Sequence, residues 1–185
     1  MALGDSLTAG YGLPADAPFP VRLARALGAK GEAVDIINAG VSGDTASDGL
    51  SRLDWSVPEG TDAVILELGA NDALRGVPPA VTRGALEAIL RRLQQRRIAV
   101  LLAGMLAPPN LGAEFTDAFD AIFPDLASRY DVVFYRFFLD GVVADPTLNQ
   151  GDGLHPTAAG VDVIVMKMLP KVEELIAKVR SARNN

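Results

Sequence analysis

Short apolar runs rich in valine, isoleucine and leucine alternate along this chain with longer amphipathic segments. This alternation is typical of repeated βαβ units around a parallel sheet. The apolar runs are almost continuously hydrophobic, which indicates that helices cover both faces of the sheet. We therefore expect an α/β fold with five parallel strands, at Met1–Leu3, Val34–Asn38, Ala63–Leu68, Ala99–Met105 and Val132–Phe137.

The amphipathic segments between these runs predict five helices. They are expected at Pro18–Gly28, Thr45–Asp54, Thr82–Arg97, Ala113–Arg129 and Pro156–Arg180. No internal repeat, low-complexity segment or linker interrupts the sequence, and 49% of its 185 residues are hydrophobic. A chain of this size can bury a sizeable core, so we expect residues 1–185 to form a single domain.

Composition argues against several classes of function. The formal net charge is −6, and the basic residues are scattered except for a cluster between Arg91 and Arg97, so nucleic acid is not an expected partner. With no cysteine and one histidine, neither a disulfide nor a metal site is expected. The longest apolar stretch, Ile98 to Ala107, is too short to span a membrane, so we expect no stable membrane insertion.

Polar loops with glycines follow the predicted strands. In open parallel sheets, ligands bind beyond the carboxyl ends of the strands. Residues Gly4–Thr8, Gly40–Asp44 and Gly69–Asp72 follow the first three strands, and Asp152 and His155 follow the fifth. We expect these four segments to meet at one edge of the sheet and to form the functional site.

The lone histidine, His155, is the only candidate for imidazole acid–base chemistry near neutral pH. Asp152 can hold one ring nitrogen and leave the other to activate a nucleophile. Ser6 lies just past a strand end, where a nucleophilic oxygen would be exposed. Each residue also has a structural interpretation, because Ser6 and Asp152 can cap helices and His155 can be a core or capping residue. Pro156 suits the first position of a helix, which favours a place for the imidazole at a helix entrance beside the site.

Donors for a developing oxyanion are present in the same loops. The backbone N–H of Gly43 and the side-chain amide of Asn71 can both serve this role. Gly43 can equally supply a positive φ angle, and Asn71 can belong to a turn or helix cap. The joint occurrence of serine, glycine, asparagine, aspartate and histidine at one edge favours acyl transfer over these separate interpretations.

These loops resemble the four sequence blocks of the SGNH or GDSL-type serine hydrolases. The blocks are Gly4-Asp5-Ser6-Leu7, Ala39 to Thr45 with its glycine, Gly69-Ala70-Asn71-Asp72 and Asp152-Gly153-Leu154-His155-Pro156. Longer stretches, such as Gly10 to Pro14 and Asn71 to Gly76, are similar to the bacterial branch of arylesterases and multifunctional thioesterase/lysophospholipase enzymes.

The resemblance implies a flavodoxin-like, three-layer α/β/α sandwich. It also implies that Ser6 is the nucleophile, His155 the base and Asp152 its orienting acid. The oxyanion hole would comprise the backbone N–H groups of Ser6 and Gly43 and the amide of Asn71. The expected reaction is ester hydrolysis through an acyl-serine, without a cofactor.

The expected partner is a small ester, most simply a short-chain aryl or alkyl ester, and a thioester or lysophospholipid is the alternative. Oligomeric state stays open. Because only three residues precede Gly4, we expect the natural chain to be longer at this end. By the resemblance, we expect a protein exported to the periplasm with its leader removed, and otherwise a cytoplasmic one.

We expect an apolar substrate groove near Leu106, Pro108 and Leu154, although core packing explains these residues equally well. Two other functions share features with this interpretation. A nucleotide- or flavin-binding protein would use the loop Asp5–Gly10 to hold a phosphate, and a non-catalytic lipid- or carbohydrate-binding module would need no triad. An α/β-hydrolase is not expected, because no Gly-x-Ser-x-Gly motif occurs.

Overall fold

A computed structural model describes residues 1–183. Within this range the chain has the expected α/β fold, with one sheet of parallel strands in the order β2-β1-β3-β4-β5. This is the strand order of flavodoxin-like folds. The strands are β1 (Ala2–Gly4), β2 (Asn38–Gly40), β3 (Ala63–Glu67), β4 (Ala99–Ala103) and β5 (Val133–Tyr135).

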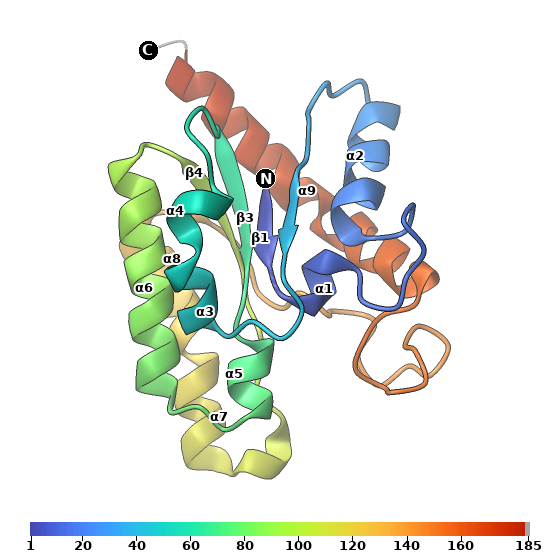
Figure 1. Ribbon diagram of the computed structural model, residues 1–185, viewed down its shortest axis with the longest axis vertical. Helices are drawn as coiled ribbons and strands as arrows, with labels where there is room; N and C mark the ends of the chain where they lie inside the picture. Colours follow the sequence, from blue (N-terminus) through green and yellow to red (C-terminus); the bar gives the residue numbers. More distant parts are fainter. Residues whose placement is uncertain (184–185) are drawn as a thin grey trace.

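Helices cover both faces of the sheet and make three layers (Figure 1). One face is covered by α2 (Phe19–Ala29) and α9 (Ala158–Arg183), which pack on each other. The opposite face is covered by α3 (Ala46–Ser51), α6 (Pro79–Gln95) and α8 (Ile122–Tyr130). Shorter helical segments complete the chain: α1 (Ser6–Ala9), α4 (Leu53–Ser56), α5 (Ala70–Leu74), the 3-10 turn η1 (Pro109–Leu111) and α7 (Ala113–Asp120).

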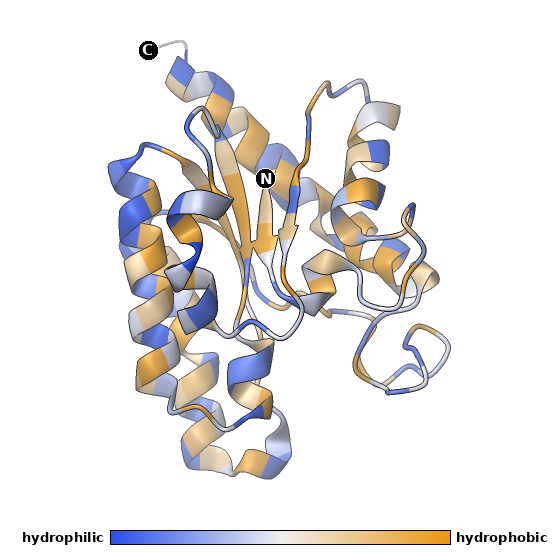
Figure 2. Cartoon of the chain, in the orientation of Figure 1, coloured by the Kyte–Doolittle hydropathy of each residue, from blue (hydrophilic) through white to orange (hydrophobic). Residues whose placement is uncertain are grey.

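The core lies between the sheet and these two helical layers. The central strands are hydrophobic along their length (Figure 2), and Leu3, Leu66 and Leu101 are fully buried. On the face covered by α2, Phe19 meets Phe138 edge to face, with ring centroids 5.1 Å apart. Burial on both faces explains why the strand sequences are apolar runs and not alternating patterns.

The prediction for the second strand was wrong. We expected Val34–Asn38, but β2 runs from Asn38 to Gly40. In the parallel register Ala2 is opposite Asn38, so the residues before Ile37 lie beyond the amino end of β1. An apolar run forms a strand only where a neighbour offers backbone groups to pair with. The second strand shares only Asn38 with its predicted range, whereas the other four strands overlap theirs over at least two residues.

Two predicted helices are each divided in the structure. The segment expected at Thr45–Asp54 forms α3 and α4, separated at Arg52, and the segment expected at Ala113–Arg129 forms α7 and α8, separated at Ala121. In the second case Pro124 provides a reason, because it lacks an N–H and is accommodated at least cost in the first turn of a helix. A new helix therefore begins at Ile122.

The last helix also begins later than expected. Pro156 was expected at its first position, but α9 starts at Ala158. Thr157 precedes it, and its hydroxyl accepts a hydrogen bond from the Gly160 N–H at 3.2 Å. Pro156 instead forms an isolated bridge with Asn149. His155 therefore belongs to the loop before α9 and not to the helix entrance.

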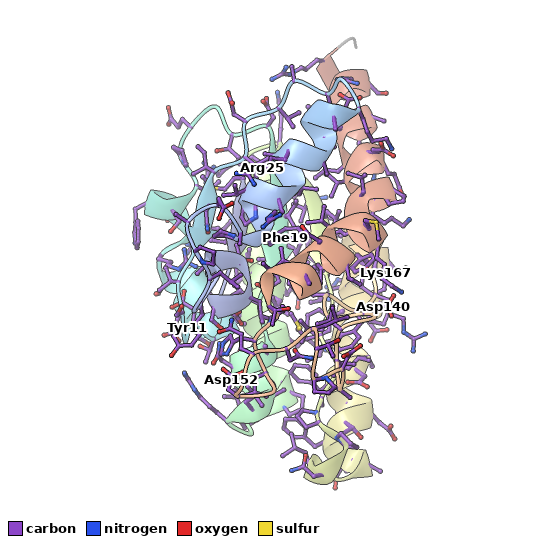
Figure 3. The ribbon with its side chains drawn as sticks, turned by 90° about the vertical axis from the view of Figure 1, so that its right-hand side faces the viewer. Tyr11, Phe19, Arg25, Asp140, Asp152 and Lys167 are labelled. Carbon is purple, nitrogen blue, oxygen red and sulfur yellow. The ribbon has the colours of Figure 1, made fainter. Side chains whose placement is uncertain are left out.

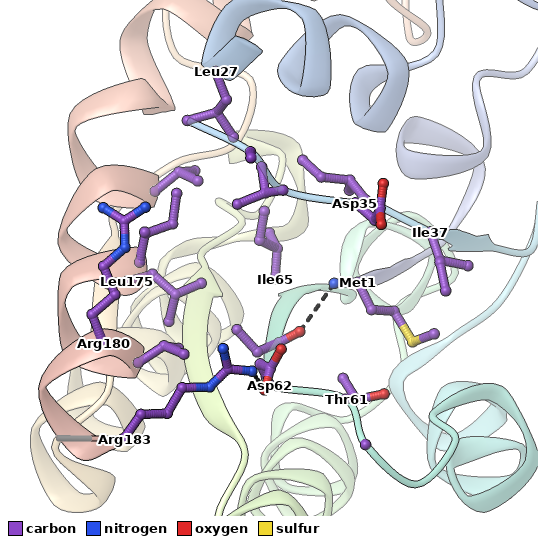
Figure 4. Close-up of a pocket in the computed structure, with 18 of the residues that line it drawn as sticks. Met1, Leu27, Asp35, Ile37, Thr61, Asp62, Ile65, Leu175, Arg180 and Arg183 are labelled. Atoms are coloured by element: carbon purple, nitrogen blue, oxygen red, sulfur yellow. Dashed lines mark hydrogen bonds and ion pairs between the residues drawn. The ribbon is translucent and has the colours of Figure 1, made fainter. Parts of the chain in front are cut away.

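A cleft of about 600 Å³ opens at the amino end of the sheet (Figure 4). The cleft is lined by residues 33–37, residues 58–63 and the last turns of α9. The amino group of Met1 lies there and donates to the Ala63 carbonyl at 3.0 Å.

None of the helices within residues 1–183 combines the length and apolarity needed to cross a bilayer.

Candidate active site

The carboxyl ends of β1, β2 and β3 bring three predicted loops to one edge of the sheet, opposite the cleft (Figure 1). Ser6 is the first residue of α1, directly after β1, and the Asp5 carboxylate caps this turn by accepting from the Leu7 N–H at 3.0 Å. Gly40, at the end of β2, approaches α1 so closely that a Cβ atom would lie 2.3 Å from the Ala9 nitrogen. Glycine is therefore required there for the first two loops to meet.

The structure places Ser6, His155 and Asp152 in one hydrogen-bonded line. His155 Nε2 lies 2.9 Å from Ser6 Oγ, and His155 Nδ1 lies 2.6 Å from Asp152 Oδ2. The other oxygen of Asp152 accepts from the backbone N–H groups of His155 and Leu154. These backbone bonds and the bond from the imidazole lower the pKa of Asp152 to about 2. The aspartate is therefore a carboxylate at neutral pH, as the partner of an imidazole N–H must be.

Two residues that the sequence analysis did not identify hold the histidine. The Tyr11 ring lies against the imidazole, with centroids 4.6 Å apart, and Figure 3 shows Tyr11 and Asp152 at the same end of the molecule. The Gln150 side chain donates to the carbonyls of Tyr11 (2.7 Å) and Pro156 (3.0 Å), and its N–H donates to the His155 carbonyl. Gln150 thus connects the loop after α1 to the histidine backbone.

The predicted oxyanion donors come to the same place. Gly43 has φ of +90°, so it supplies the positive φ angle expected as its structural role. Its carbonyl accepts from the Arg75 guanidinium at 2.8 Å. Asn71, in α5, donates from Nδ2 to the Asp44 carbonyl at 3.0 Å and to Asp5 Oδ2 at 3.2 Å. The backbone N–H groups of Ser6 and Gly43 donate to no other group within residues 1–183. They are available to a ligand.

Arg52 connects the loops that follow β1 and β2. Its buried guanidinium pairs with Asp44 and donates to the carbonyls of Ala39 and Gly4. The ends of β1 and β2 are therefore tied to the break between α3 and α4. Because the predicted helix is interrupted at Arg52, its guanidinium lies where it can donate hydrogen bonds to the carbonyls at the ends of β1 and β2.

Two buried carboxyl groups, Asp5 and Glu67, lie behind the serine. Burial raises the pKa of Asp5 to about 6, and burial together with the Asp5 charge raises the pKa of Glu67 well above its usual value. The sequence analysis gave neither residue a role. Glu67 had a visible signal, because it is a charged residue inside the apolar run Ala63–Leu68.

The residues expected to line a substrate groove lie at this edge of the sheet and are partly open to solvent. Leu106 is 37% and Leu154 49% exposed, and Pro108 is half-buried. Other exposed apolar residues lie within five positions of a site residue in the chain: Val41, Leu74 and Tyr11. Several apolar side chains in the loops at this edge are therefore open to solvent.

Comparison with known proteins agrees with this arrangement. The sequence model of the GDSL-like Lipase/Acylhydrolase family matches residues 2–163. The chain belongs to this family. It is 40% identical to an arylesterase of Vibrio mimicus, over 84% of this chain and 78% of the relative. It is 36% identical to thioesterase 1/protease 1/lysophospholipase L1 of Escherichia coli K12, over 95% of this chain and 84% of the relative.

Solved structures of GDSL hydrolases share the fold. The SGNH-hydrolase family esterase AlinE4 is 47% identical, with a TM-score of 0.79 over 94% of this chain and 93% of that chain. TesA is 32% identical, with a TM-score of 0.89 over 94% of this chain and 97% of that chain. This GDSL hydrolase is therefore a carboxylic ester hydrolase, which argues against the flavin-binding and non-catalytic alternatives.

Proposed function

We propose that this GDSL hydrolase cleaves short-chain aryl and alkyl esters through an acyl-Ser6 intermediate. The observation that carries the proposal is the hydrogen-bonded line from Ser6 Oγ through both nitrogens of His155 to Asp152, at 2.9 and 2.6 Å. A serine hydroxyl is a weak nucleophile until a base within hydrogen-bond reach takes its proton. In this proposal His155 is that base and Asp152 its orienting carboxylate, and the two distances support the assignment.

In the proposed first step, Ser6 Oγ bonds to the ester carbonyl carbon while His155 Nε2 takes the hydroxyl proton. The tetrahedral intermediate collapses, the bond to the leaving oxygen breaks, and the imidazolium gives its proton to that oxygen. Water then attacks the acyl-serine with the same proton transfers, which releases the carboxylic acid and restores Ser6. Asp152 stays ionised throughout and stabilises the imidazolium.

The oxyanion of both tetrahedral intermediates would accept from the N–H groups of Ser6 and Gly43 and from the Asn71 amide. Both hydrogens of that amide are engaged in this structure, with the Asp44 carbonyl and the Asp5 carboxylate. The contact to Asp5 is the longer of the two. We expect it to be the one that Asn71 shares with the oxyanion.

Partly exposed apolar side chains in the loops at the carboxyl edge of the sheet support ester substrates with apolar groups. Leu154 adjoins the histidine, and Leu106 and Pro108 follow β4 at the same edge. The Vibrio mimicus relative is named an arylesterase, whereas the Escherichia coli relative is named a thioesterase and lysophospholipase. Thioesters and lysophospholipids are therefore the second substrate candidate for the same site.

The decisive test replaces the nucleophile. Ser6→Ala should abolish hydrolysis of p-nitrophenyl acetate and labelling by a fluorophosphonate, while circular dichroism and the melting temperature stay like those of the parent protein. Ser42→Ala, a serine in the second loop, is the matched control and should keep activity and labelling. Equal hydrolysis by Ser6→Ala and the parent would refute the proposal.

Substrate preference needs a separate measurement. We expect kcat/KM to be highest for p-nitrophenyl esters of short acids and to fall as the acyl chain lengthens. Palmitoyl-CoA and a lysophosphatidylcholine, assayed under the same conditions, represent the second candidate. Higher kcat/KM for either long-chain substrate would favour the thioesterase or lysophospholipase assignment.

A further inference from the structure

Glu67 is a fully buried acid directly behind the turn that carries the nucleophile. It is the last residue of β3, where it lies opposite Gly4 of β1 and Ala103 of β4. None of the steps proposed above uses it. A carboxyl group in such a position is costly to bury and needs a reason to be there.

The contacts of Glu67 are with the nucleophile turn. Its Oε2 accepts from the Thr8 hydroxyl at 2.7 Å and from the Asp5 N–H at 3.4 Å. Gly4 leaves the space for this contact, because a Cβ there would lie 2.2 Å from the Thr8 hydroxyl oxygen and 2.5 Å from Glu67 Oε2. These bonds hold the residues on both sides of Ser6. The other oxygen, Oε1, is buried and has no partner within the described part of the chain.

Asp5 extends this chain of contacts to the oxyanion donor. Its carboxylate accepts from the Leu7 N–H and from the Asn71 amide. Glu67 therefore reaches Ser6 through the Asp5 and Thr8 contacts, and Asn71 through Asp5. It touches neither the triad nor the expected position of the substrate.

The charges around Glu67 favour its neutral form. From the β1–α1 turn, Asp5 presents a negative charge that raises the pKa of Glu67. Arg52, between α3 and α4, donates to Gly4 and pairs with Asp44 but makes no ion pair with Glu67 within residues 1–183. Asp72 of α5 is turned toward Ala46 and Thr82, and the neighbour from β4 is the uncharged Ala103.

We propose that Glu67 is a positioning residue that holds the nucleophile turn and the Asn71 donor in place only while its carboxyl group is protonated. This inference rests on the proposed function of Ser6 and Asn71. With Glu67 neutral, the buried pair carries the single charge of Asp5, which orients Asn71. Ionisation of Glu67 would place a second negative charge against Asp5 in a site without a compensating cation, and the turn would move.

The test compares pH profiles of kcat for the parent protein, Glu67→Gln and Glu67→Ala. Glutamine keeps an acceptor for Thr8 and Asp5 and cannot ionise, so Glu67→Gln should keep kcat within about threefold at neutral pH. The parent protein should lose kcat reversibly at alkaline pH, with little change in KM, and Glu67→Gln should not. Glu67→Ala should have a low kcat at every pH, and Glu87→Gln, on α6, should behave like the parent protein.

Several outcomes would overturn the proposal. One is an alkaline decline that is the same in the parent protein and Glu67→Gln. Another is a kcat of Glu67→Gln as low as that of Glu67→Ala. An infrared difference spectrum between the parent protein and Glu67→Gln gives a readout independent of activity, because the carbonyl stretch of the protonated Glu67 carboxyl should be present at neutral pH only in the parent protein and disappear at alkaline pH. Its absence at neutral pH would also contradict the proposal.

The result for Ser6→Ala separates this inference from the proposed function. If Ser6→Ala stays active, the serine mechanism fails whatever the Glu67 variants do. A second outcome affects the role of Glu67 alone. Ser6→Ala is then inactive and fluorophosphonate labels Ser6 in Glu67→Gln, but the decline of kcat at alkaline pH is the same in Glu67→Gln and in the parent protein.

Discussion

Individual residues at the edge of the sheet have more than one task. Asn71 is an expected oxyanion donor, but it also joins Asp5 to the Asp44 carbonyl. Asp152 faces the imidazole with one oxygen and binds the loop backbone with the other. A substitution at either position therefore changes both the catalytic step and the local hydrogen bonds of the loop. Its control must separate these two effects.

Replacing the amide donor should slow the chemical step. We expect Asn71→Ala to lower kcat by about 10² to 10³, with a smaller change in KM, because one oxyanion donor is lost. Asn110→Ala, at an exposed position after β4, is the control and should have the kcat of the parent protein. Steady-state kinetics with p-nitrophenyl acetate would measure both, and a loss of kcat below threefold would contradict a role for Asn71 in the oxyanion hole.

Removing the charge of the third triad member should be more damaging. Asp152→Asn keeps the shape of the side chain but should lower kcat by about 10⁴, because the amide no longer fixes the imidazole tautomer. The pKa of about 2 means that the parent protein keeps this carboxylate charged across any practical assay range. Retention of a tenth of the parent kcat by Asp152→Asn would count against the assigned role.

The sequence named the residues that the structure brings together at Ser6, because each follows a strand and parallel strands end at a common edge. It did not name the residues that orient them. Gln150 and Tyr11 are 139 positions apart, and Asp5 and Glu67 are 62 apart, and only the finished fold puts these pairs in contact. Glu67 was visible as an anomaly in an apolar run, but its partners were not.

At the scale of elements, apolar patterns located the helices and strands but not all of their ends. The second strand is displaced because pairing with β1, and not hydrophobicity, decides which residues of Val34–Gly40 join the sheet. The single helix predicted at Thr45–Asp54 divides at Arg52, whose side chain donates to the carbonyls at the ends of β1 and β2. Such ends depend on contacts with distant elements, which a local pattern does not contain.

Asp72 joins two elements on one face of the sheet and gives a test at this scale. Its two oxygens accept from the Ala46 N–H at the start of α3 and from the Thr82 hydroxyl of α6, each at 2.8 Å. Asp72→Ala would leave both buried donors without an acceptor, so we expect the free energy of unfolding to fall by roughly 2 kcal/mol or more.

Urea denaturation would measure this loss. Asp54→Ala is the matched control, because Asp54 forms an exposed ion pair with Arg92, and such pairs contribute about 1 kcal/mol or less. If Asp72→Ala and Asp54→Ala had the same free energy of unfolding, the connection between α3 and α6 would be unimportant.

At the scale of the whole molecule, the buried acids make stability depend on pH. The pKa of Glu67 is raised in the folded state from an ordinary value of 4.5. Below that value both states bind the proton and the residue has no effect. As pH rises above it, the unfolded chain releases the proton first, so the free energy of unfolding falls until the folded state also ionises.

Glu67→Gln should remove this contribution. We expect the variant to gain stability relative to the parent protein as pH rises from 4.5 through neutrality, and to show no such gain in more acidic buffers. Denaturant titrations at several pH values would measure the difference. If the free energies of unfolding of the two proteins changed in parallel with pH, the folded state would not raise the pKa of Glu67.

The cleft beside Met1 determines how the enzyme can be handled in the laboratory. The buried amine there has a lowered pKa because of desolvation, and it contacts Ala63 inside the sheet. An affinity tag fused ahead of Met1 would convert this amine to an amide, and its linker would start in the cleft lined by residues 33–37, residues 58–63 and the last turns of α9. The first linker residues would therefore lie at the start of β1, the strand that leads directly into the turn carrying Ser6.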